Sequence, residues 1–455
     1  MSTQIVVAAN RLPVRQVDGC WETSPGGLVR ALVPILEARG GAWVGWPGIA
    51  DTPLEPFEHD GISQIPVTLS QDDIDDFYFG FCNGTLWPLY HDAVIAPDFH
   101  RHWWRAYESV NRRYAEQVLD VLDPAGIAWV QDYQLQLVPE FIREAEPGAT
   151  IGFYLHIPFP PIELFARLPW RDEIVRGLLA SDVVAFQTRR SGENFIRCAR
   201  RYGNAVPIGR GMLDVGGRHV RVQRAPIGID VGEFRQLAQS PQIQQQAQKI
   251  RRAMGEPDKV ILGVDRLDYT KGIDVRLKAV ETLMTWSKDE DVRYEFVQVA
   301  VPSRESVPAY GELREHVEAL VGRINGEHAR PGWSPIHYLY RSLPLEELVA
   351  YYVAADVMLV TPLRDGMNLV AKEYVACRVD NDGVLILSEF AGAAEQMRAA
   401  MLVNPHDVNA VASALRKAVT LDPAEIEAKM RALNRTVKRE DVYRWARLCL
   451  EALGA

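Results

Sequence analysis

The segment Asp365-Gly-Met-Asn-Leu-Val-Ala-Lys-Glu373 decides the fold class of this chain. It follows the apolar run 356–364, Asp-Val-Met-Leu-Val-Thr-Pro-Leu-Arg, which is typical of a buried strand in a parallel sheet. A turn with Gly and Asn then leads into a helix that we expect to start at about Leu369. The first backbone N–H groups of such a helix have no partner within the helix, so they suit an anionic ligand above the sheet.

Two side chains of this segment suit a sugar nucleotide. Asp365 stands at the expected strand end, where a short carboxylate can accept hydrogen bonds from sugar hydroxyls. Glu373 lies four residues into the helix, within reach of a ribose diol. The same pattern is also typical of an ordinary strand–loop–helix connection, because such caps are common. The segment alone therefore leaves a nucleotide-sugar site and a structural turn both open.

Length and composition limit the class of protein. The chain has 455 residues, 47% of them hydrophobic, which predicts two domains of about 200 residues with large buried cores. The net charge of −10 excludes a general basic field for nucleic acid. An anionic substrate would therefore need a locally basic cleft.

Cysteine usage and hydropathy indicate the compartment. The five cysteines have no CxxC spacing, so we expect thiols in a reducing environment and neither a disulfide frame nor a zinc site. The N-terminal sequence lacks the regions of a signal peptide, and no stretch approaches about 18 consecutive apolar residues. We expect a cytoplasmic protein with small-molecule partners, without nucleic acid or membrane binding, and homo-oligomerisation stays open. The histidines lack metal-ligand spacing, so we predict no metal.

Short apolar runs alternate with helical stretches, which predicts α/β architecture with parallel sheets. Helices are expected at 346–355 and 408–419. A Gln-rich segment, 235–248, separates two such series, so we place a domain boundary at about residue 230. The expected buried strands are 4–9, 128–130, 150–155, 182–186, 259–264, 294–301, 336–340, 356–360 and 383–387.

Polar residues follow the expected strands. Ligands of open α/β sheets bind beyond the carboxyl ends of the strands, and a random scatter of polar residues would not keep falling there. The residues in question are Asn10-Arg11, Gln131-Asp132-Tyr133, His156, Asp265-Arg266 with Lys271, Ser303-Arg304 and Asp365.

The charged residues each have a structural alternative. Arg266 and Lys271 offer a planar fork and a point charge near one strand end, but Asp268 between them allows a structural ion pair. Arg11 and Arg304 can grip a phosphate or can lie on the surface as ordinary arginines.

The uncharged candidates are also ambiguous. Asp132 and His156 can position hydroxyls or assist proton transfer, although a lone His after a strand is more often structural. Tyr78 and Trp87 are more often core residues. The pair Gly26-Gly27 lets a backbone approach a phosphate or makes a plain turn.

Together these segments resemble the trehalose-6-phosphate synthase family, retaining glucosyltransferases that join a nucleotide-activated glucose to glucose 6-phosphate. The resemblance covers most of the chain, and several specific segments occur in the right order. They are Asn10-Arg-Leu-Pro-Val14, Ser24-Pro-Gly-Gly-Leu28, Leu86-Trp-Pro-Leu-Tyr-His91, Asp132-Tyr133, Phe153-Tyr-Leu-His-Ile-Pro-Phe-Pro160, Val264-Asp-Arg-Leu-Asp-Tyr-Thr-Lys-Gly-Ile273, Gly322-Arg-Ile-Asn-Gly326 and Arg364-Asp-Gly-Met-Asn-Leu-Val-Ala-Lys-Glu373.

The resemblance implies a GT-B fold, in which two Rossmann-like domains face each other across a deep cleft. The acceptor-binding domain would span 1–230 and the nucleotide-sugar-binding domain 231–440, with a last helix at about 440–455 packing back on the first domain. UDP-glucose or GDP-glucose would be the donor and glucose 6-phosphate the acceptor, giving trehalose 6-phosphate without a metal or cofactor.

The resemblance also implies the site residues. Arg266 and Lys271 would hold the diphosphate, and Asp365 the glucose hydroxyls. The implied donor site comprises Gly27, Arg266, Lys271, Asp365, Gly366, Met367, Asn368, Leu369, Val370 and Glu373. The implied acceptor site comprises Arg11, Tyr78, Trp87, Asp132 and Arg304. The residues implied at the reacting centre are Arg266, Lys271, His156, Asp132 and Asp365, none of them as a nucleophile.

Two departures from the family pattern keep alternatives open. The usual His-Asp-Tyr-His reads Gln131-Asp-Tyr-Gln134, and the usual Asn-Gln near the base reads Tyr340-Arg-Ser-Leu-Pro344, which leaves UDP-glucose and GDP-glucose both open. A sister transferase with another phosphorylated acceptor (a glucosylglycerol-phosphate synthase or a pseudo-glycosyltransferase) and a silent sugar-phosphate sensor are the other candidate functions. The presence of Arg266, Lys271 and Asp365 argues against the sensor.

Overall fold

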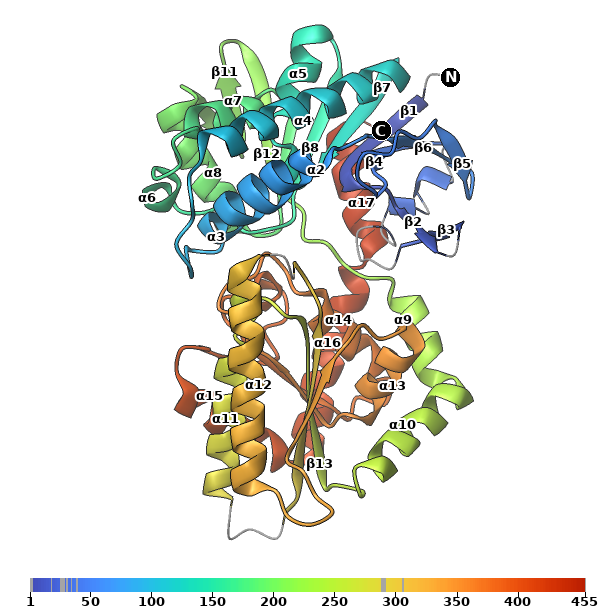
Figure 1. The fold of residues 1–455 in the computed structure, drawn as a ribbon, viewed down its shortest axis with the longest axis vertical. Coiled ribbons are helices and arrows are strands. Elements are labelled where there is room, and N and C mark those ends of the chain that lie inside the picture. Colours follow the sequence, from blue (N-terminus) through green and yellow to red (C-terminus); the bar gives the residue numbers. More distant parts are fainter. Residues whose placement is uncertain are drawn as a thin grey trace. The chain divides into compact units, whose positions relative to one another are not determined.

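The computed structural model describes residues 3–17, 19–24, 29, 32–33, 35–37, 40–287, 292–304 and 307–454. The chain divides into two compact units (Figure 1). Unit 1 comprises Met1–Ile227 with Val442–Ala455, and unit 2 comprises Gly228–Asp441. Each unit has its own, mainly parallel sheet with helices packed on it, which confirms the predicted α/β class.

In the described residues, unit 1 contains a sheet with the strand order β10-β11-β12-β9-β8-β7-β1-β4-β6-β5. Its central pairs are parallel, and antiparallel pairs occur only towards the two edges. A separate hairpin joins β2 (Val14–Val17) to β3 (Cys20–Thr23). The strands of the large sheet are β1 (Thr3–Arg11), β4 (Ala42–Trp46), β5 (Phe57–His59), β6 (Ile62–Pro66), β7 (Leu122–Gln131), β8 (Thr150–Leu155), β9 (Val183–Phe186), β10 (Val206–Gly209), β11 (Met212–Val215) and β12 (Arg218–Arg224).

The helices of unit 1 include one from the end of the chain. Helix α17 (Val442–Ala452) packs on β7 and β8, where the ring of Trp445 lies 5.4 Å from Trp129 and 5.2 Å from Tyr154. The other helices are α2 (Gln71–Asp73), the π-helix η1 (Ile74–Leu86), α3 (Trp87–Tyr90), α4 (Arg101–Val121), the 3₁₀ turn η2 (Tyr133–Leu135), α5 (Val138–Ala145), α6 (Ile162–Phe165), α7 (Arg171–Leu179) and α8 (Arg189–Tyr202).

Unit 2 contains an all-parallel sheet in the order β15-β14-β13-β16-β17-β18. In chain order this is the 3-2-1-4-5-6 arrangement of a doubly wound sheet. The strands are β13 (Lys259–Arg266), β14 (Tyr294–Val301), β15 (Ile336–Tyr340), β16 (Val357–Val360), β17 (Val384–Ser388) and β18 (Met401–Val403).

Helices cover both faces of this sheet (Figure 1). One face carries α11 (Ile273–Trp286), α12 (Pro308–His328) and α15 (Val408–Val419), and the other carries α9 (Val231–Gln239), α10 (Pro241–Ala253), α13 (Leu345–Ala354), α14 (Leu369–Cys377) and α16 (Pro423–Arg439). Short 3₁₀ turns are η3 (Tyr269–Lys271) and η4 (Gly392–Glu395).

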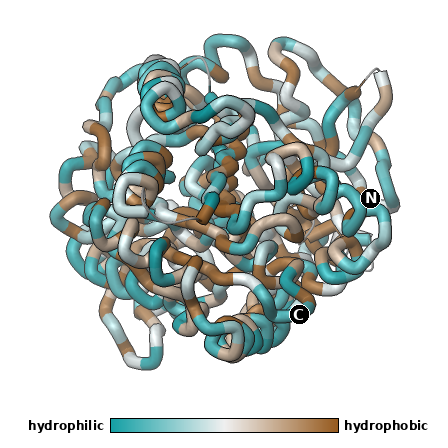
Figure 2. Tube along the Cα trace, turned by 90° about the horizontal axis from the view of Figure 1, so that it is seen from below, coloured by the Kyte–Doolittle hydropathy of each residue, from teal (hydrophilic) through white to brown (hydrophobic). Residues whose placement is uncertain are grey.

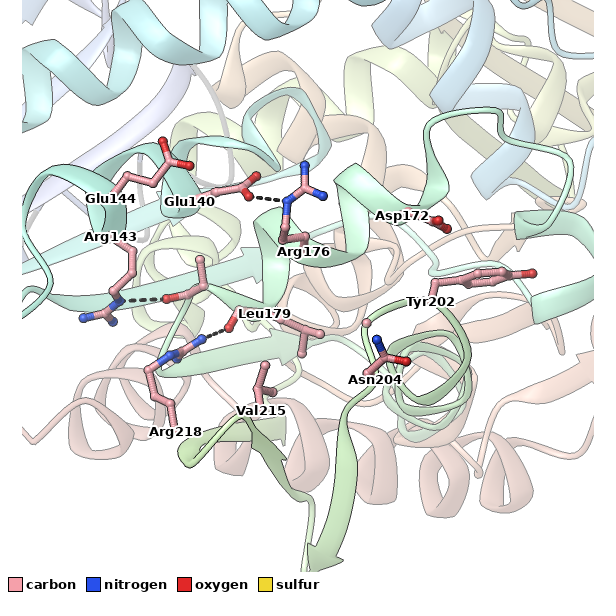
Figure 3. Close-up of a pocket in the computed structure, with 12 residues that line it drawn as sticks. Glu140, Arg143, Glu144, Asp172, Arg176, Leu179, Tyr202, Asn204, Val215 and Arg218 are labelled. Atoms are coloured by element: carbon pink, nitrogen blue, oxygen red, sulfur yellow. Dashed lines mark hydrogen bonds and ion pairs between the residues drawn. The ribbon is translucent and has the colours of Figure 1, made fainter.

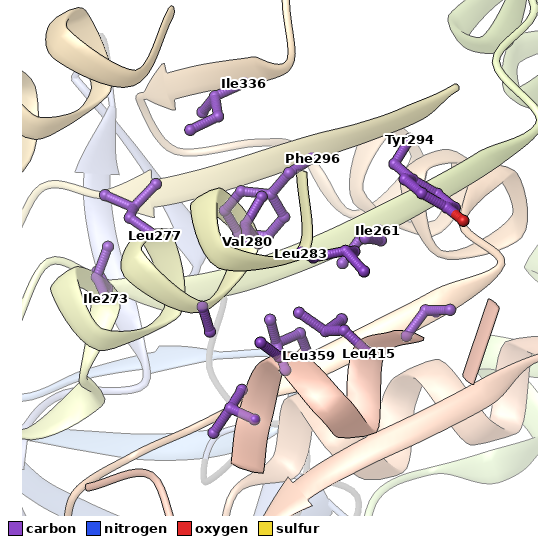
Figure 4. Close-up of a cluster of buried hydrophobic side chains, with 14 of the residues drawn as sticks. Ile261, Ile273, Leu277, Val280, Leu283, Tyr294, Phe296, Ile336, Leu359 and Leu415 are labelled. Carbon is purple, nitrogen blue, oxygen red and sulfur yellow. The ribbon is translucent and has the colours of Figure 1, made fainter. Parts of the chain in front are cut away.

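The core beneath α11 follows from helical periodicity. Ile273, Leu277, Val280 and Leu283 recur at the spacing of one helix face, and all are buried. In Figure 4 they meet side chains of the sheet such as Phe296. Figure 2 shows short hydrophobic and hydrophilic stretches alternating along the trace, as expected when one face of an element is removed from water and the other is not.

Several sequence predictions match the structure closely. The runs 150–155, 294–301 and 336–340 form β8, β14 and β15 with the expected bounds, and 408–419 forms α15. Other strands were not predicted, among them β4 and β6. In the part of the chain that the structure describes, no helix combines the length and apolar character that a membrane span requires.

One prediction needs correction. The apolar run 356–364 forms a strand only as far as Val360, because Pro362 has no N–H to donate to a ladder, so Asp365 follows a loop and does not end the strand directly. The Gln-rich segment, for which the sequence analysis made no secondary-structure prediction, is helical and belongs to α9 and α10. Ser240 caps α10 by accepting from the backbone N of Ile243 at 3.3 Å, and Ile243 is buried.

Candidate functional site

In each sheet the chain adds strands first on one side of its first strand and then on the other. The predicted residues lie at this reversal, where the two directions meet. In unit 2 the reversal falls between β13 and β16; Arg266 ends β13, and Asp365 follows β16. In unit 1 it falls between β1 and β7; Arg11 ends β1, and Asp132 follows β7. Ligands of doubly wound sheets bind at this reversal, beyond the carboxyl ends of the strands.

The unit 2 edge consists of Arg266, Lys271, Arg304, Asp365 and Glu373. The unit 1 edge consists of Arg11, Tyr78, Trp87, Asp132 and His156.

In the unit 2 edge, Lys271 and Asp365 are in contact. Lys271 ends η3, and Gly272 follows it at φ +61°, where an added Cβ would lie 2.5 Å from the Thr361 carbonyl oxygen. This glycine lets the chain turn so that Lys271 Nζ donates to Asp365 Oδ2 at 2.7 Å. The side chains are only 10% and 14% exposed, so the pair is mostly shielded from water.

The turn after Asp365 aims a helix end at this pair. Asn368 adopts φ +95° and caps α14, because its Oδ1 accepts from Ala371 N at 3.0 Å. Its Nδ2 donates to Asp365 Oδ2 at 3.3 Å. The amides of Leu369 and Val370 have no partner among the described residues. The helix therefore has an ordinary cap, and two of its first N–H groups remain for an anion.

Asp268 pairs with Arg304 and not with Lys271. The carboxylate meets Arg304 Nη1 at 3.2 Å and accepts from the Tyr310 hydroxyl at 3.1 Å. Burial alone would raise the pKa of Asp268, but the charges of Arg304, Arg266 and Lys271 outweigh burial and lower this pKa to about 2. Arg304 is thus bound by Asp268 of its own unit, unit 2. The other four predicted acceptor residues belong to unit 1.

A second buried ion pair lies behind this edge. Arg276 Nη2 meets Asp265 at 2.8 Å, and the two side chains are 0% and 3% exposed. Arg276 also donates to Gln298 Oε1 at 2.9 Å and to Thr361 Oγ1 at 3.1 Å. Burial raises the pKa of Asp265 despite the opposing charge of Arg276. This pair was not predicted from the sequence. The sequence does place Arg276 on the apolar face of α11, and a buried arginine requires a buried partner.

Glu373 is anchored by an aromatic hydroxyl. Tyr352 donates to Glu373 Oε2 at 2.8 Å, and burial raises the pKa of Tyr352, so the phenol stays a donor. This bond fixes the carboxylate in the early part of α14, where we expect a ribose.

In the unit 1 edge, Arg11 lies over an aromatic surface. Its guanidinium carbon is 4.2 Å from the centroid of the Trp46 ring, and Trp46 lies 6.3 Å from the Tyr78 ring. Arg11 is exposed, and none of the ion pairs among the described residues includes it. The stacked cation is therefore available to an anion beside Tyr78.

A long π-helix, which is a rare structure, positions the two predicted acceptor aromatics. Tyr78 lies in η1, and Trp87 follows directly after it. Asn83 Nδ2 donates to the Tyr78 carbonyl at 2.7 Å, and Asn83 Oδ1 accepts from the Tyr133 hydroxyl at 3.0 Å. Tyr133 in turn lies 5.7 Å from the Trp87 ring. Asn83, which we did not predict, thus connects both aromatics.

Asp132 has an unusual backbone conformation. Its φ is +70° and ψ is 173°, a region that residues with a side chain rarely adopt and that often marks functional sites. A hydrogen bond from the Asp132 backbone N–H to the Tyr154 carbonyl, at 2.7 Å, holds the backbone in this strained conformation. Asp132 Oδ1 accepts from the His156 backbone N at 3.1 Å, so the structure brings these two predicted residues together.

Comparison with known proteins places the chain in a family. The profile of glycosyltransferase family 20 matches residues 1–455. The chain belongs to glycosyltransferase family 20. It is 51% identical to the trehalose-6-phosphate synthase of Mycolicibacterium smegmatis, over 100% of this chain and 93% of that protein.

Solved family 20 structures confirm the predicted GT-B class. A UDP-forming alpha,alpha-trehalose-phosphate synthase from Burkholderia xenovorans, in complex with glucose-6-phosphate, is 33% identical with a TM-score of 0.92, covering 99% of this chain and 100% of that one. A structure from E. coli bound with UDP-2-fluoro glucose is 34% identical with a TM-score of 0.92, covering 99% and 98%.

One predicted residue of the family 20 site, Gly27, lies outside the described residues. One group of described residues, Glu281, Glu327 and His328, lies close enough to share a metal ion. However, Arg323 bonds to both oxygens of Glu281 at 2.6 and 2.8 Å and to Glu327 at 3.1 Å, so these carboxylates already have a cation.

A cavity of about 520 Å³ in unit 1 is separate from the predicted family 20 site (Figure 3). It lies beside residues that precede β9 and begin β12, at the amino end of the sheet. Arg143 there meets Asp182 at 2.8 Å, and Arg218 donates to the Ser181 carbonyl at 2.8 Å. Both arginines therefore support the start of β9, and neither is free to bind an anion.

Proposed function

We propose that this protein is a trehalose-6-phosphate synthase, which transfers glucose from UDP-glucose to glucose 6-phosphate with retention of the anomeric configuration and gives trehalose 6-phosphate and UDP. Family 20 membership and full-length similarity to trehalose-6-phosphate synthases support the reaction. The observation that carries the proposal is the Lys271–Asp365 contact beside the uncommitted amides of α14.

In the proposal, unit 2 holds the donor. Arg266 and Lys271 bind the diphosphate together with the amides of Leu369 and Val370, because cations and a helix N-terminus both attract negative charge. Asp365 and the backbone from Gly366 to Asn368 take the glucose hydroxyls, and Glu373 takes the ribose. The 2.8 Å bond from Tyr352 keeps the Glu373 carboxylate in place for this contact.

Unit 1 supplies most of the acceptor site. Arg11, stacked on Trp46, meets the phosphate of glucose 6-phosphate, and Tyr78 and Trp87 line the same place. Arg304 of unit 2 adds a second cation for this phosphate. Asp132 takes sugar hydroxyls, because a carboxylate accepts hydrogen bonds from them.

The chemistry follows from where charge develops. Breaking the bond between C1 and the phosphate gives an oxocarbenium-like state and puts growing negative charge on the departing diphosphate. The side chains of Arg266 and Lys271 stabilise that charge more in the transition state than in the bound donor, so they accelerate the step. No side chain serves as a nucleophile, and the departing phosphate oxygen accepts the proton of the attacking hydroxyl.

Two alternatives are tested in the same experiment. The purified protein is incubated with UDP-, GDP- or ADP-glucose and either glucose 6-phosphate or glycerol 3-phosphate, and the product linkage is determined by NMR. We expect α,α-linked trehalose 6-phosphate, with UDP-glucose as the preferred donor. Turnover with glycerol 3-phosphate alone would identify a sister transferase, and binding of sugar phosphates without any turnover would identify a sensor.

We also propose that the enzyme acts in the cytoplasm on these small molecules. Its five cysteines are free thiols, four of them buried, which suits a reducing compartment. Localisation of a tagged full-length protein tests this part of the proposal, and a secreted, oxidised protein would contradict it.

A further inference from the structure

His156 lies in an enclosed position at the carboxyl end of β8. Its ring lies 4.5 Å from the ring of Tyr154 and 6.2 Å from that of Trp445 on α17. Both ring nitrogens have partners within unit 1, and each partner is a glutamine. Gln131 Oε1 lies 3.0 Å from Nε2, and Gln187 Nε2 lies 3.5 Å from Nδ1.

The direction of these hydrogen bonds is set by the backbone. Gln187 Oε1 accepts from the Ile227 backbone N–H at 2.9 Å, so the other atom of this amide, the donor Nε2, faces His156. Nδ1 of His156 must then be the acceptor, and the ring proton is on Nε2. This N–H in turn donates to Gln131 Oε1, and Gln131 is fully buried.

The charged and titratable neighbours do not oppose this arrangement. Asp132, on the element after β7, uses Oδ1 to accept the backbone N–H of His156. On the other sides lie Tyr154 and, near it on α17, Cys449; burial raises the pKa of both, so they are neutral at pH 7. Burial also lowers the pKa of His156 to about 3. In a protonated ring Nδ1–H would face the Nε2 donor of Gln187, and two donors cannot form a hydrogen bond with each other.

We infer that Gln131 and Gln187 are positioning residues that hold His156 as a neutral imidazole protonated on Nε2, with both nitrogens occupied, so that this histidine does not carry a proton in the reaction. The role in the reaction rests on the proposed function. Gln131 stands where the family usually has a histidine. An amide oxygen only accepts and so fixes the proton on Nε2 of His156, whereas a second imidazole could donate to Nε2 and reverse the tautomer.

The test measures the ring nitrogens directly. The full-length protein is labelled with ¹⁵N-histidine, the signals of His156 are identified by their loss in His156→Gln, and their shifts are followed from pH 8 to pH 5. We expect a single neutral form protonated on Nε2 throughout. A ring that titrates near its usual pKa of about 6.5, or that carries its proton on Nδ1, overturns the inference.

Two variants and a control separate positioning from simple structural support. Gln131→Glu keeps the shape of the side chain but puts an anion beside Nε2–H, so the pKa of His156 should rise by about 1–3 units and a matching inflection should appear in the pH profile of kcat. Gln131→Leu removes the acceptor and should lower kcat about ten- to a hundredfold, with both KM values changed less than about threefold, through misplacement of the ring. Gln134→Leu, a buried glutamine in the same segment without a contact to His156, should leave the ring signals unchanged. An unaltered His156 in Gln131→Glu contradicts the inference.

Failure of the proposed function gives a different result. Wild-type protein that makes no trehalose 6-phosphate, while its His156 stays protonated on Nε2, refutes the function and leaves the tautomer assignment standing. Active wild-type protein with a titrating His156 refutes only the inference.

Discussion

Gly263→Ala tests the buried ion pair that supports the unit 2 edge. An alanine Cβ at this position in β13 would lie 2.5 Å from Arg276 Nη1 and 2.6 Å from Gln298 Oε1, closer than such atoms approach. Arg276 is fully buried and bonded to Asp265, Gln298 and Thr361, so the guanidinium cannot move without breaking bonds.

The size of the effect follows from these contacts. Disrupting a buried ion pair costs about 3–5 kcal/mol, because a charge is left without its partner. For a unit of this size, 1 kcal/mol shifts Tm by about 2–4 °C, so the transition of unit 2 should fall on the order of 10 °C. Arg276 also lies 3.5 Å from the Lys271 carbonyl, so turnover should fall together with stability.

The assay is urea unfolding followed by circular dichroism, with calorimetry to separate the transitions of the two units. A matched control is Gly322→Ala in α12, where an added Cβ meets nothing within 4 Å. That variant should gain about 0.5–1 kcal/mol from the better helix former. If Gly263→Ala unfolds within about 0.5 kcal/mol of wild type, the ion pair does not support unit 2 as described.

Three further predictions concern single contacts. Arg304→Lys keeps a cation beside Asp268 but loses the planar fork, so the KM for glucose 6-phosphate should rise at least about tenfold with donor hydrolysis spared; an unchanged KM removes Arg304 from the acceptor site. Tyr352→Phe removes the hydrogen bond that the Tyr352 hydroxyl donates to Glu373, so the KM for UDP-glucose should rise about tenfold in steady-state kinetics, and a KM equal to wild type would contradict the anchoring role. The pKa of Asp268 is lowered from 3.8 to about 2 in the folded state, so its contribution of about 2 kcal/mol is present above pH 4 and is lost as pH falls towards 2. The difference in unfolding free energy between wild type and Asp268→Asn should therefore shrink from pH 5 to pH 3, and a constant difference would contradict the assigned pKa.

Periodicity predicted the parts of the fold in which local pattern and burial agree. The strands β8, β14 and β15 and the helix α15 are regular apolar or amphipathic runs, and their bounds were predicted closely. The expected strand 356–360 ends where β16 ends, but the placement of Asp365 at the strand end was wrong. Apolar character continues past Val360 into a loop that is buried for a tertiary reason, because the Thr361 carbonyl packs on Gly272. Hydropathy alone does not distinguish a buried loop from a buried strand.

The placement of candidate residues at strand ends was predictable, but their partners were not. The rule that parallel strands end at one edge puts Arg266 and Asp365 at the reversal of the unit 2 sheet. The pairing of Asp268 with Arg304, 36 residues away, depends on the register of β13 and β14, which no local pattern encodes. The bond from Gln187 to His156 likewise depends on tertiary contact.

The proposed reaction depends on cations of unit 2 that stabilise the departing diphosphate, and Arg266→Ala tests this most directly. Arg266 is exposed, so its loss should leave Tm within about 2 °C of wild type while kcat for trehalose 6-phosphate formation falls about 10²–10³-fold. Arg252→Ala, an exposed arginine on α10 away from the edge, serves as the control and should keep wild-type turnover. A normally folded Arg266→Ala enzyme with wild-type kcat would contradict the role of these cations.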